Sequence, residues 1–392
     1  MAELLGRRRG HHAAPGRWLG RWLGGWLAAW LALAVWLPFP AWAQGRIQNV
    51  FEVIDVAVDV TAETAAQARE KAMADGQARA FRQLLERLTL RIEHGGLPEL
   101  SALETAGYVS DFSVADEKTS DVRYLAKVTF RFKPDQVRGL LNDYGFSFAE
   151  TVSKLVMVLP VFQSAGALIL WDDPNPWRDA WASRPKKQGL VPTLLPLGDL
   201  ADMASIGAEQ AMDGDRQRLN AIAGRYGASD TLVVFGVLRV DAVKARRVLD
   251  VYSTRYGKQL KEQTEVVSFA QEKDETIEGL LSRAAEEMTF IVEDNWKRDN
   301  ILQFERAGLI SAVVPISGLR DWLLVRSRLG RVAVIRRTEM VLLSQGEVRV
   351  NLHFIGGTGQ LALALEQADL KLSNEGGKWI LVPDSGRPPN KS

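Results

Sequence analysis

The chain has 392 residues, with 49 Lys and Arg against 48 Asp and Glu, a formal net charge of +1 and no cysteine. The absence of cysteine excludes disulfides, thiolate metal sites, cysteine nucleophiles and a lipid-modified N-terminal cysteine. The balanced charge argues against a general nucleic-acid binder, because such proteins carry a basic excess. The length is ample for two or three domains with cores of their own.

The N-terminus has the composition of an export signal. A leader with five arginines precedes an uncharged run, 22–43, that is rich in Trp, Leu and Ala and ends in the A-x-A site Ala41-Trp42-Ala43. We therefore expect a signal peptide over 1–43, cleaved between Ala43 and Gln44. The alternative is an uncleaved anchor, but the apolar part is shorter than the roughly 20 residues of a spanning helix. The expected location is the periplasm of a Gram-negative envelope, with no stable membrane span after cleavage.

Residues 46–148 predict an N-terminal α+β domain of order β-α-β-β-α. The alternation over 50–60 predicts a half-buried strand, with the valines and isoleucine at 50, 54, 56, 58 and 60 on its apolar face. Thr64 is a capping residue for a helix over 65–88, and small residues such as Gly76 would let that helix lie close to a sheet. A hairpin of 108–114 with 122–132 follows, and Pro134 opens a short helix.

Residues 153–300 predict a central three-layer α/β domain. The continuous apolar run at 155–161 is typical of a strand that is buried on both faces. Further strands are expected over 190–197, 231–240, 248–254 and 265–269. Helices are expected over 178–181 and 213–226, and a last one carries an apolar stripe that starts at Ile277.

Residues 301–383 predict a C-terminal ferredoxin-like domain of order β-α-β-β-α-β. We expect a strand over 309–315, a helix that Ser317 caps, a hairpin of 332–343 with 348–354, a second helix around 361–368 and a short closing hairpin. In the first helix the inward residues are expected to be Leu319, Leu323, Val325 and Leu329. The polar tail, 384–392, is expected to be disordered.

The most pointed cluster of candidate residues is a tryptophan-rich loop. It contains Trp171, Asp172, Asp173, Trp177 and Trp181. Two adjacent carboxylates lack the further oxygen ligands of a Ca²⁺ loop, so a turn with packed tryptophans is the plainer interpretation of the chemistry. Exposed tryptophans are, however, enriched at interface hot spots. We name these five residues as a candidate partner-binding loop and predict no catalytic residue, no metal and no cofactor.

Several stretches of the mature chain carry a family pattern. They are 51–60, Ala65-Ala66-Gln67-Ala68-Arg69, Phe132-Lys133-Pro134, 155–160 and Trp171-Asp172-Asp173. Together they resemble the exported proteobacterial family called domain of unknown function two-zero-six-six. More distantly, 155–160 and 227–236 look like the α/β domain at the N-terminus of TolB-type proteins, to which curli-secretion and flagellar-accessory envelope proteins are similar. The resemblance implies an envelope protein that works by protein–protein contact, and it brings no catalytic residues.

The sequence thus favours a non-enzymatic assembly or scaffolding factor whose partners are other envelope proteins, not nucleic acid. The alternative is a periplasmic module that binds a small ligand or a cell-wall fragment in a cleft near 171–181. A third hypothesis is a cryptic hydrolase that uses Asp172 or Asp173, since a catalytic acid depends on a pKa shift that sequence does not reveal.

Overall fold

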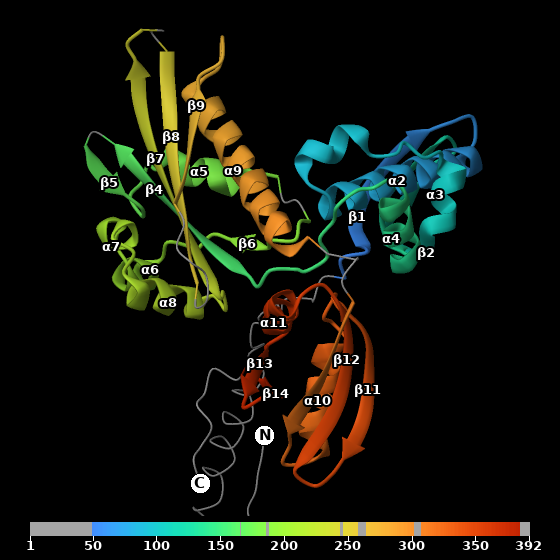
Figure 1. Ribbon diagram of the computed structural model, residues 1–392. Helices are drawn as coiled ribbons and strands as arrows, with labels where there is room; N and C mark the ends of the chain where they lie inside the picture. Colours follow the sequence, from blue (N-terminus) through green and yellow to red (C-terminus); the bar gives the residue numbers. More distant parts are fainter. Residues whose placement is uncertain are drawn as a thin grey trace, which may run out of the picture. The chain divides into compact units, whose positions relative to one another are not determined.

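The computed structural model describes residues 49–164, 166–185, 188–243, 246–257, 264–301 and 307–384 (Figure 1). Residues 49–392 form a compact unit of their own. The predicted signal peptide and its Ala43–Gln44 cleavage site lie outside the described residues, as does the tail beyond Asp384. Within these ranges the fold is mixed α+β with three sheets, which confirms the predicted class. Among the helices in the same ranges, none combines the length and the apolar composition needed to span a bilayer.

The first sheet is antiparallel and packs against a long helix. Its strand order is β1-β3-β2, with β1 (Glu52–Thr61), β2 (Val109–Thr119) and β3 (Arg123–Phe132). The helix, α2 (Ala65–Leu88), has the predicted bounds, and Thr64 Oγ1 accepts from the backbone N–H of Gln67 at 3.2 Å. A Cβ atom added to Gly76 would lie 2.7 Å from Cγ1 of Val58, so the helix lies as close to the sheet as its small residues predict.

A β-bulge in β1 corrects the predicted pattern of burial. Asp55 has a φ of 56°, and the register with β3 shifts between Val53 and Val56. Because the bulge inserts one residue, the inward side changes parity there. Val53 is buried before the bulge and Val56 after it, whereas Ile54, which strict alternation placed in the core, is only partly buried.

Short helices complete this part of the chain. They are the 3₁₀ helix η1 (Arg91–Gly96), α3 (Ala102–Tyr108) and α4 (Pro134–Asp143). The sequence did not predict α3, which has seven residues and too few turns to show a periodicity. A capping box stabilises the start of α3. In it the backbone N–H of Ser101 donates to the Glu104 carboxylate, and the backbone N–H of Glu104 donates to the Ser101 hydroxyl.

The second sheet has the order β5-β4-β7-β8-β9, and β6 also pairs with β4. The strands are β4 (Val156–Ser164), β5 (Ala167–Ile169), β6 (Thr193–Leu194), β7 (Asp230–Asp241), β8 (Arg246–Tyr256) and β9 (Thr264–Ala270). β4 is parallel to β7, and β8 is antiparallel to both of its neighbours, β7 and β9. The strand expected over 190–197 is reduced to the two residues of β6, because Pro192 and Pro196 have no N–H to donate.

Helices cover both faces of the second sheet (Figure 1). They are α5 (Pro176–Ser183) and α9 (Ile277–Asn300) on one face, and α6 (Leu200–Ser205), α7 (Ala208–Met212) and α8 (Arg216–Arg225) on the other. Along β4, Val158 packs toward α5 and α9, whereas Leu159 packs toward α8. The three layers are therefore as predicted. The helix expected over 213–226 is α8, which begins only at Arg216, after Gly214 with its φ of 68°.

The third sheet has the order β11-β12-β10-β14-β13. Its elements are β10 (Ala307–Pro315), α10 (Leu319–Leu329), β11 (Ile335–Leu343), β12 (Glu347–Ile355), α11 (Thr358–Gln367), β13 (Leu370–Glu375) and β14 (Lys378–Pro383). From β10 to α11 the order of elements is the predicted β-α-β-β-α. The closing hairpin departs from the ferredoxin-like arrangement, because β14 rather than β13 lies beside β10 and runs parallel to it.

Helix α10 buries a different stripe from the predicted one. Gly318, not Ser317, is its N-cap, and Leu319 and Leu323 are 61% and 50% exposed. The buried residues are Trp322, Val325 and Leu329. These lie three and four residues apart, so they form one helical face, and burying the large indole removes more apolar area from water than burying Leu319 would.

Candidate functional site

The predicted partner-binding loop is only partly at the surface. Asp172 and Asp173 are exposed and Trp171 is partly buried. Trp177 and Trp181 are 0% and 1% exposed, and their rings pack edge to face with 5.8 Å between centroids. The structure corrects the expectation that these two tryptophans face a partner. They lie on the face of α5 that meets the sheet, where Trp177 Nε1 donates to the carbonyl of Val234 at 3.0 Å.

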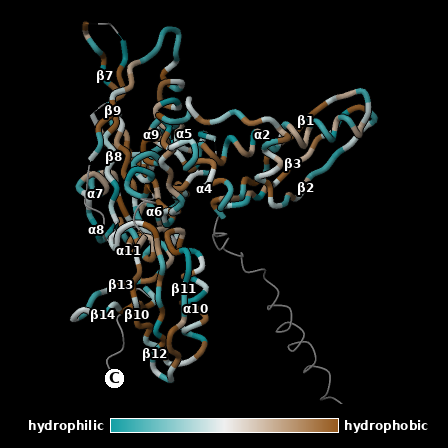
Figure 2. The backbone as a smooth tube through the Cα atoms, turned by 45° about the vertical axis from the view of Figure 1, so that its right-hand side comes forward, coloured by the Kyte–Doolittle hydropathy of each residue, from teal (hydrophilic) through white to brown (hydrophobic). Residues whose placement is uncertain are grey.

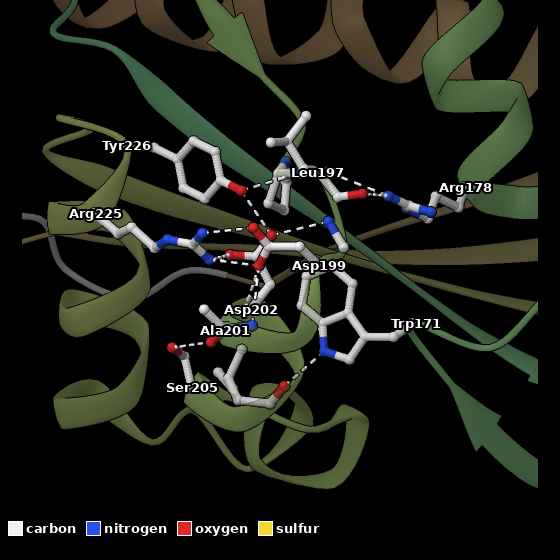
Figure 3. Close-up of polar contacts among 12 residues, drawn as sticks. Trp171, Arg178, Leu197, Asp199, Ala201, Asp202, Ser205, Arg225 and Tyr226 are labelled. Atoms are coloured by element: carbon white, nitrogen blue, oxygen red, sulfur yellow. Dashed lines mark hydrogen bonds and ion pairs between the residues drawn. The ribbon is translucent and has the colours of Figure 1, made fainter. Parts of the chain in front are cut away.

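The surface part of this loop is tied to a second segment, 196–206, which the sequence analysis did not single out. Trp171 Nε1 donates to the carbonyl oxygen of Ile206 at 2.7 Å. Arg178 places its guanidinium 5.9 Å from the Trp171 ring centroid and donates from Nη2 to the carbonyl of Leu197 at 2.6 Å. The loop and the segment therefore form one surface, whose polar support is drawn in Figure 3.

Asp199 is the first part of that support. It is the N-cap of α6, where Oδ1 accepts from the N–H groups of Ala201 and Asp202 at 3.0 and 2.9 Å. From α8, Arg225 donates to both carboxylate oxygens, Nη1 to Oδ1 at 2.8 Å and Nη2 to Oδ2 at 2.6 Å. The Arg225 guanidinium, together with the backbone donors, holds the pKa of Asp199 well below its usual range.

Asp202 is the second part, and its side chain is fully buried. Its carboxylate accepts from the Tyr226 hydroxyl at 2.6 Å, from the N–H of Gly198 at 2.8 Å and from Arg225. The Tyr226 hydroxyl also accepts from the N–H of Leu197 at 2.9 Å. Burial, and the hydrogen bond to Asp202, raise the pKa of Tyr226.

The contacts of this network fit a structural support. Both carboxylates are engaged by several donors, and a carboxylate whose pKa is lowered, such as that of Asp199, is a weak general base. Only Asp202 is fully buried, but a network of paired polar groups that is anchored on a buried carboxylate makes its segment rigid. We therefore interpret Asp199, Asp202, Arg225 and Tyr226 as a support that fixes the backbone of 197–202.

This support presents three apolar side chains to solvent. Leu197, Leu200 and Met203 are 75%, 84% and 45% exposed, and we call them the Leu197 surface. They lie three residues apart, and Leu200 and Met203 share one face of α6. The backbone of Leu197 is bound on both sides, through its N–H to Tyr226 and its carbonyl to Arg178. Single exposed leucines are common, but three on one fixed segment mark a candidate contact surface.

The described ranges contain no group of three or more His, Asp or Glu side chains placed to hold a metal ion. Of the histidines in these ranges, His94 has Nε2 3.1 Å from the carbonyl oxygen of Glu86. His353 lies on β12 with Nε2 3.3 Å from Oε2 of Glu339. His94 lies in η1 and His353 lies in β12 of the third sheet, and their rings lie near different groups.

The comparisons with known proteins do not assign a family. No family model matches the chain, and no curated protein is significantly similar to it. Among solved structures, the chain is similar to the lipoprotein GNA1162 from Neisseria meningitidis, with 12% sequence identity and a TM-score of 0.23 over 36% of this chain and 97% of that chain. The resemblance to family two-zero-six-six therefore stays a prediction.

Proposed function

We propose that this chain is a non-enzymatic assembly or scaffolding factor of the cell envelope, which binds a partner protein through the Leu197 surface. The expected export signal over 1–43 supports the periplasmic location. The observation that carries the proposal is the exposure of Leu197, Leu200 and Met203 on a backbone that Tyr226 and Arg178 hold in place.

A fixed apolar segment is suited to protein recognition. Because the backbone of Leu197 is already bound in the free protein, little conformational entropy remains to be lost on binding. Apolar anchors with a polar rim are the common arrangement of an interface hot spot. Asp172 and Asp173 are exposed on the adjoining loop, so the favoured partner surface is apolar with basic groups at its edge.

The alternative, a ligand or cell-wall module near 171–181, has less support. Trp177 and Trp181 were the aromatic residues that would stack on a sugar or a small ligand, and both are buried in the core. The gap beside Trp181, lined also by Arg184 and Glu293, is too narrow to hold a water molecule. Ligand binding there would require the core to open.

The test is site-specific crosslinking in the native envelope. A photoreactive residue replaces Met203, with the same residue at Val240, an exposed position of β7, as the control. We expect a discrete protein adduct from position 203 that is absent from position 240. The adduct should disappear when Leu197→Asp and Leu200→Asp are combined, while the melting temperature is retained, because neither leucine lies in a core. Glycan adducts alone, or an adduct that survives the double variant, would contradict the proposal.

A further inference from the structure

The end of β11 is apolar on both of its faces. Met340, Val341, Leu342 and Leu343 are between 42% and 59% exposed. Met340 and Leu343 lie opposite Val350 and Val348, on the buried face of the sheet, whereas Leu342 lies opposite Arg349 on the open face. In the part of the chain that the structure describes, β11 is one of the two edge strands of its sheet. Natural edge strands are commonly protected by charge, so four consecutive exposed apolar residues here call for an explanation.

Helix α10 adds leucines at the same end of the sheet. The N–H of Ile316 donates to the carbonyl of Gly346 at 3.0 Å, which places the start of α10 beside the turn between β11 and β12. Leu319 and Leu323, one helical turn apart, are exposed on α10. Figure 1 shows α10 alongside β11 and β12, and Figure 2 marks the hydrophobic stretch at the end of β11 in brown. We call Leu319, Leu323 and Met340, Val341, Leu342 and Leu343 the tip surface.

The charges around the leucines of α10 are mainly positive. Arg320 and Arg326 are exposed, and within the described residues the structure pairs neither of them with a carboxylate. The acidic residue of the helix, Asp321, is partly buried and accepts from the N–H of Ser317 at 2.7 Å. The exposed side of α10 therefore combines leucine with arginine, a composition that favours an anionic surface.

We propose that the tip surface contacts the anionic phospholipid of a membrane. A protein that docks on a sheet edge or on one face of a strand covers only one side of it. The headgroup region of a bilayer surrounds a protruding tip, and it accommodates Met340 and Leu343 on one face together with Leu342 on the other. Arginines beside the apolar residues attract lipid phosphates, and they act without inserting deeply. This inference is independent of the Leu197 surface, which belongs to the second sheet.

The experiment is co-sedimentation with vesicles. It uses the chain from Gln44, because residues 49–392 form a compact unit of their own and the apolar leader would bind lipid by itself. Vesicles contain phosphatidylcholine alone or phosphatidylcholine mixed with phosphatidylglycerol. We expect binding to the mixed vesicles, weakened by salt, and little binding to phosphatidylcholine alone.

Two variants and a control separate the contributions. Val341→Asp with Leu342→Asp should abolish sedimentation, because it removes the apolar tip and adds negative charge. Arg320→Ala with Arg326→Ala should weaken binding to mixed vesicles by about fivefold for each arginine. Leu200→Asp, which removes a still more exposed leucine of the Leu197 surface, should sediment as the parent chain does. All of these residues are exposed, so circular dichroism and thermal melting should be unchanged.

Several outcomes overturn the proposal. They are no sedimentation with either vesicle, equal sedimentation with both, or full sedimentation of the Val341→Asp and Leu342→Asp variant. A photoreactive residue at Leu342 that yields protein adducts and no lipid adducts in the native envelope also overturns it, and would assign the tip surface to a protein partner. Leu200→Asp changes the Leu197 surface and leaves the tip surface intact, so its sedimentation with vesicles tests this inference alone. Failure of the proposed function and failure of this inference can therefore be told apart.

Discussion

The hydroxyl of Tyr226 donates a 2.6 Å hydrogen bond to Oδ2 of Asp202, which joins the end of α8 to a fully buried carboxylate of α6. The same hydroxyl accepts from the N–H of Leu197 at 2.9 Å. One phenol thus satisfies part of a buried charge and also fixes the segment that exposes the Leu197 surface. The stability of the fold and the order of the candidate binding surface are therefore linked through this side chain.

Replacing Tyr226 by phenylalanine tests this link. Tyr226→Phe deprives the Asp202 carboxylate of a donor, so we expect a loss of about 1–3 kcal/mol in the free energy of unfolding. Amide exchange over 197–203 should become faster as well, because Leu197 loses its acceptor. Tyr144→Phe, at a tyrosine that is 57% exposed, is the matched control and should stay within about 0.5 kcal/mol. Unchanged exchange over 197–203 would show that the remaining bonds, from Arg178, Asp199 and Asp202, hold the segment without the Tyr226 hydroxyl.

A second buried group joins segments that are far apart in the chain. Arg87 on α2 is 6% exposed and donates to the carbonyls of Val50, Glu52 and Gln188 at 2.7 to 2.8 Å. Burial lowers its pKa to about 10, although Glu293 and Glu52 favour the charge. Its guanidinium therefore connects α2, the start of β1 and the segment that leads to β6.

Arg87→Met keeps most of the side-chain volume but leaves these carbonyls without a donor. We expect the free energy of unfolding to fall by about 3 kcal/mol, since each unpaired buried polar group costs about 1–3 kcal/mol. The control is Arg79→Met on the same helix, where an exposed arginine donates one 2.8 Å hydrogen bond to the Ala57 carbonyl. Denaturant unfolding of both variants gives the comparison, and an equal cost at the two positions would contradict the assigned role of Arg87.

The sequence predicted long periodic elements well. Helix α2 and strand β4 have strong patterns, since one alternates small and apolar residues over many turns and the other is a continuous apolar run. The bulge at Asp55 left no such pattern, because a single φ of 56° reverses the parity of a strand without changing its composition.

The candidate site was largely beyond sequence reasoning. Helix α6 has six residues, too few for a periodicity, and Asp202 and Tyr226 are brought together only by the packing of α6 on α8. One local signal was present in the pair Gly198-Asp199. Gly198 has a φ of 75°, which favours glycine, and Asp199 is a residue type that commonly caps a helix. The burial of Trp177 agrees with the interpretation of a turn with packed tryptophans and not with a partner-binding role, but the local sequence alone did not decide between the two.

Acid should weaken the fold. Hydrogen bonds from Arg225, Arg239 and Arg283 lower the pKa values of Asp199, Asp250 and Glu275, respectively. The unfolded chain therefore binds protons at these groups more readily than the folded chain does. Their contribution is complete above the unfolded pKa values of about 4 and is lost as the pH falls through the lower folded values.

Asp199→Asn isolates one of these contributions. The variant should be less stable than the parent at neutral pH, because Arg225 loses a charged acceptor, and the difference should shrink as the pH falls below about 4. Urea unfolding over a pH series measures both curves. A difference that grows toward acid pH would show that the Asp199 carboxylate is not stabilised by its pairing in the folded state.

The last prediction concerns the close contact of α2 with the first sheet. Gly76→Ala would place a Cβ 2.7 Å from Cγ1 of Val58, which is buried, and such overpacking costs about 1–3 kcal/mol. Alanine also gains up to about 1 kcal/mol of helix propensity, so the net change at Gly76 should be a loss of stability. Gly139→Ala in α4 is the matched control, because a Cβ there meets no atom within 4 Å. The control should gain stability, giving the two substitutions opposite signs.

A double variant then shows whether Val58 is the cause of the loss. Val58→Ala alone should be destabilising because it leaves a cavity under α2. Combined with Gly76→Ala, the added methyl group fills part of that space, so the double variant should lose clearly less stability than the two single losses predict together. Strict additivity would mean that α2 moves away from the sheet to admit the methyl group, and the distance between Gly76 and Val58 would then not be fixed by their packing.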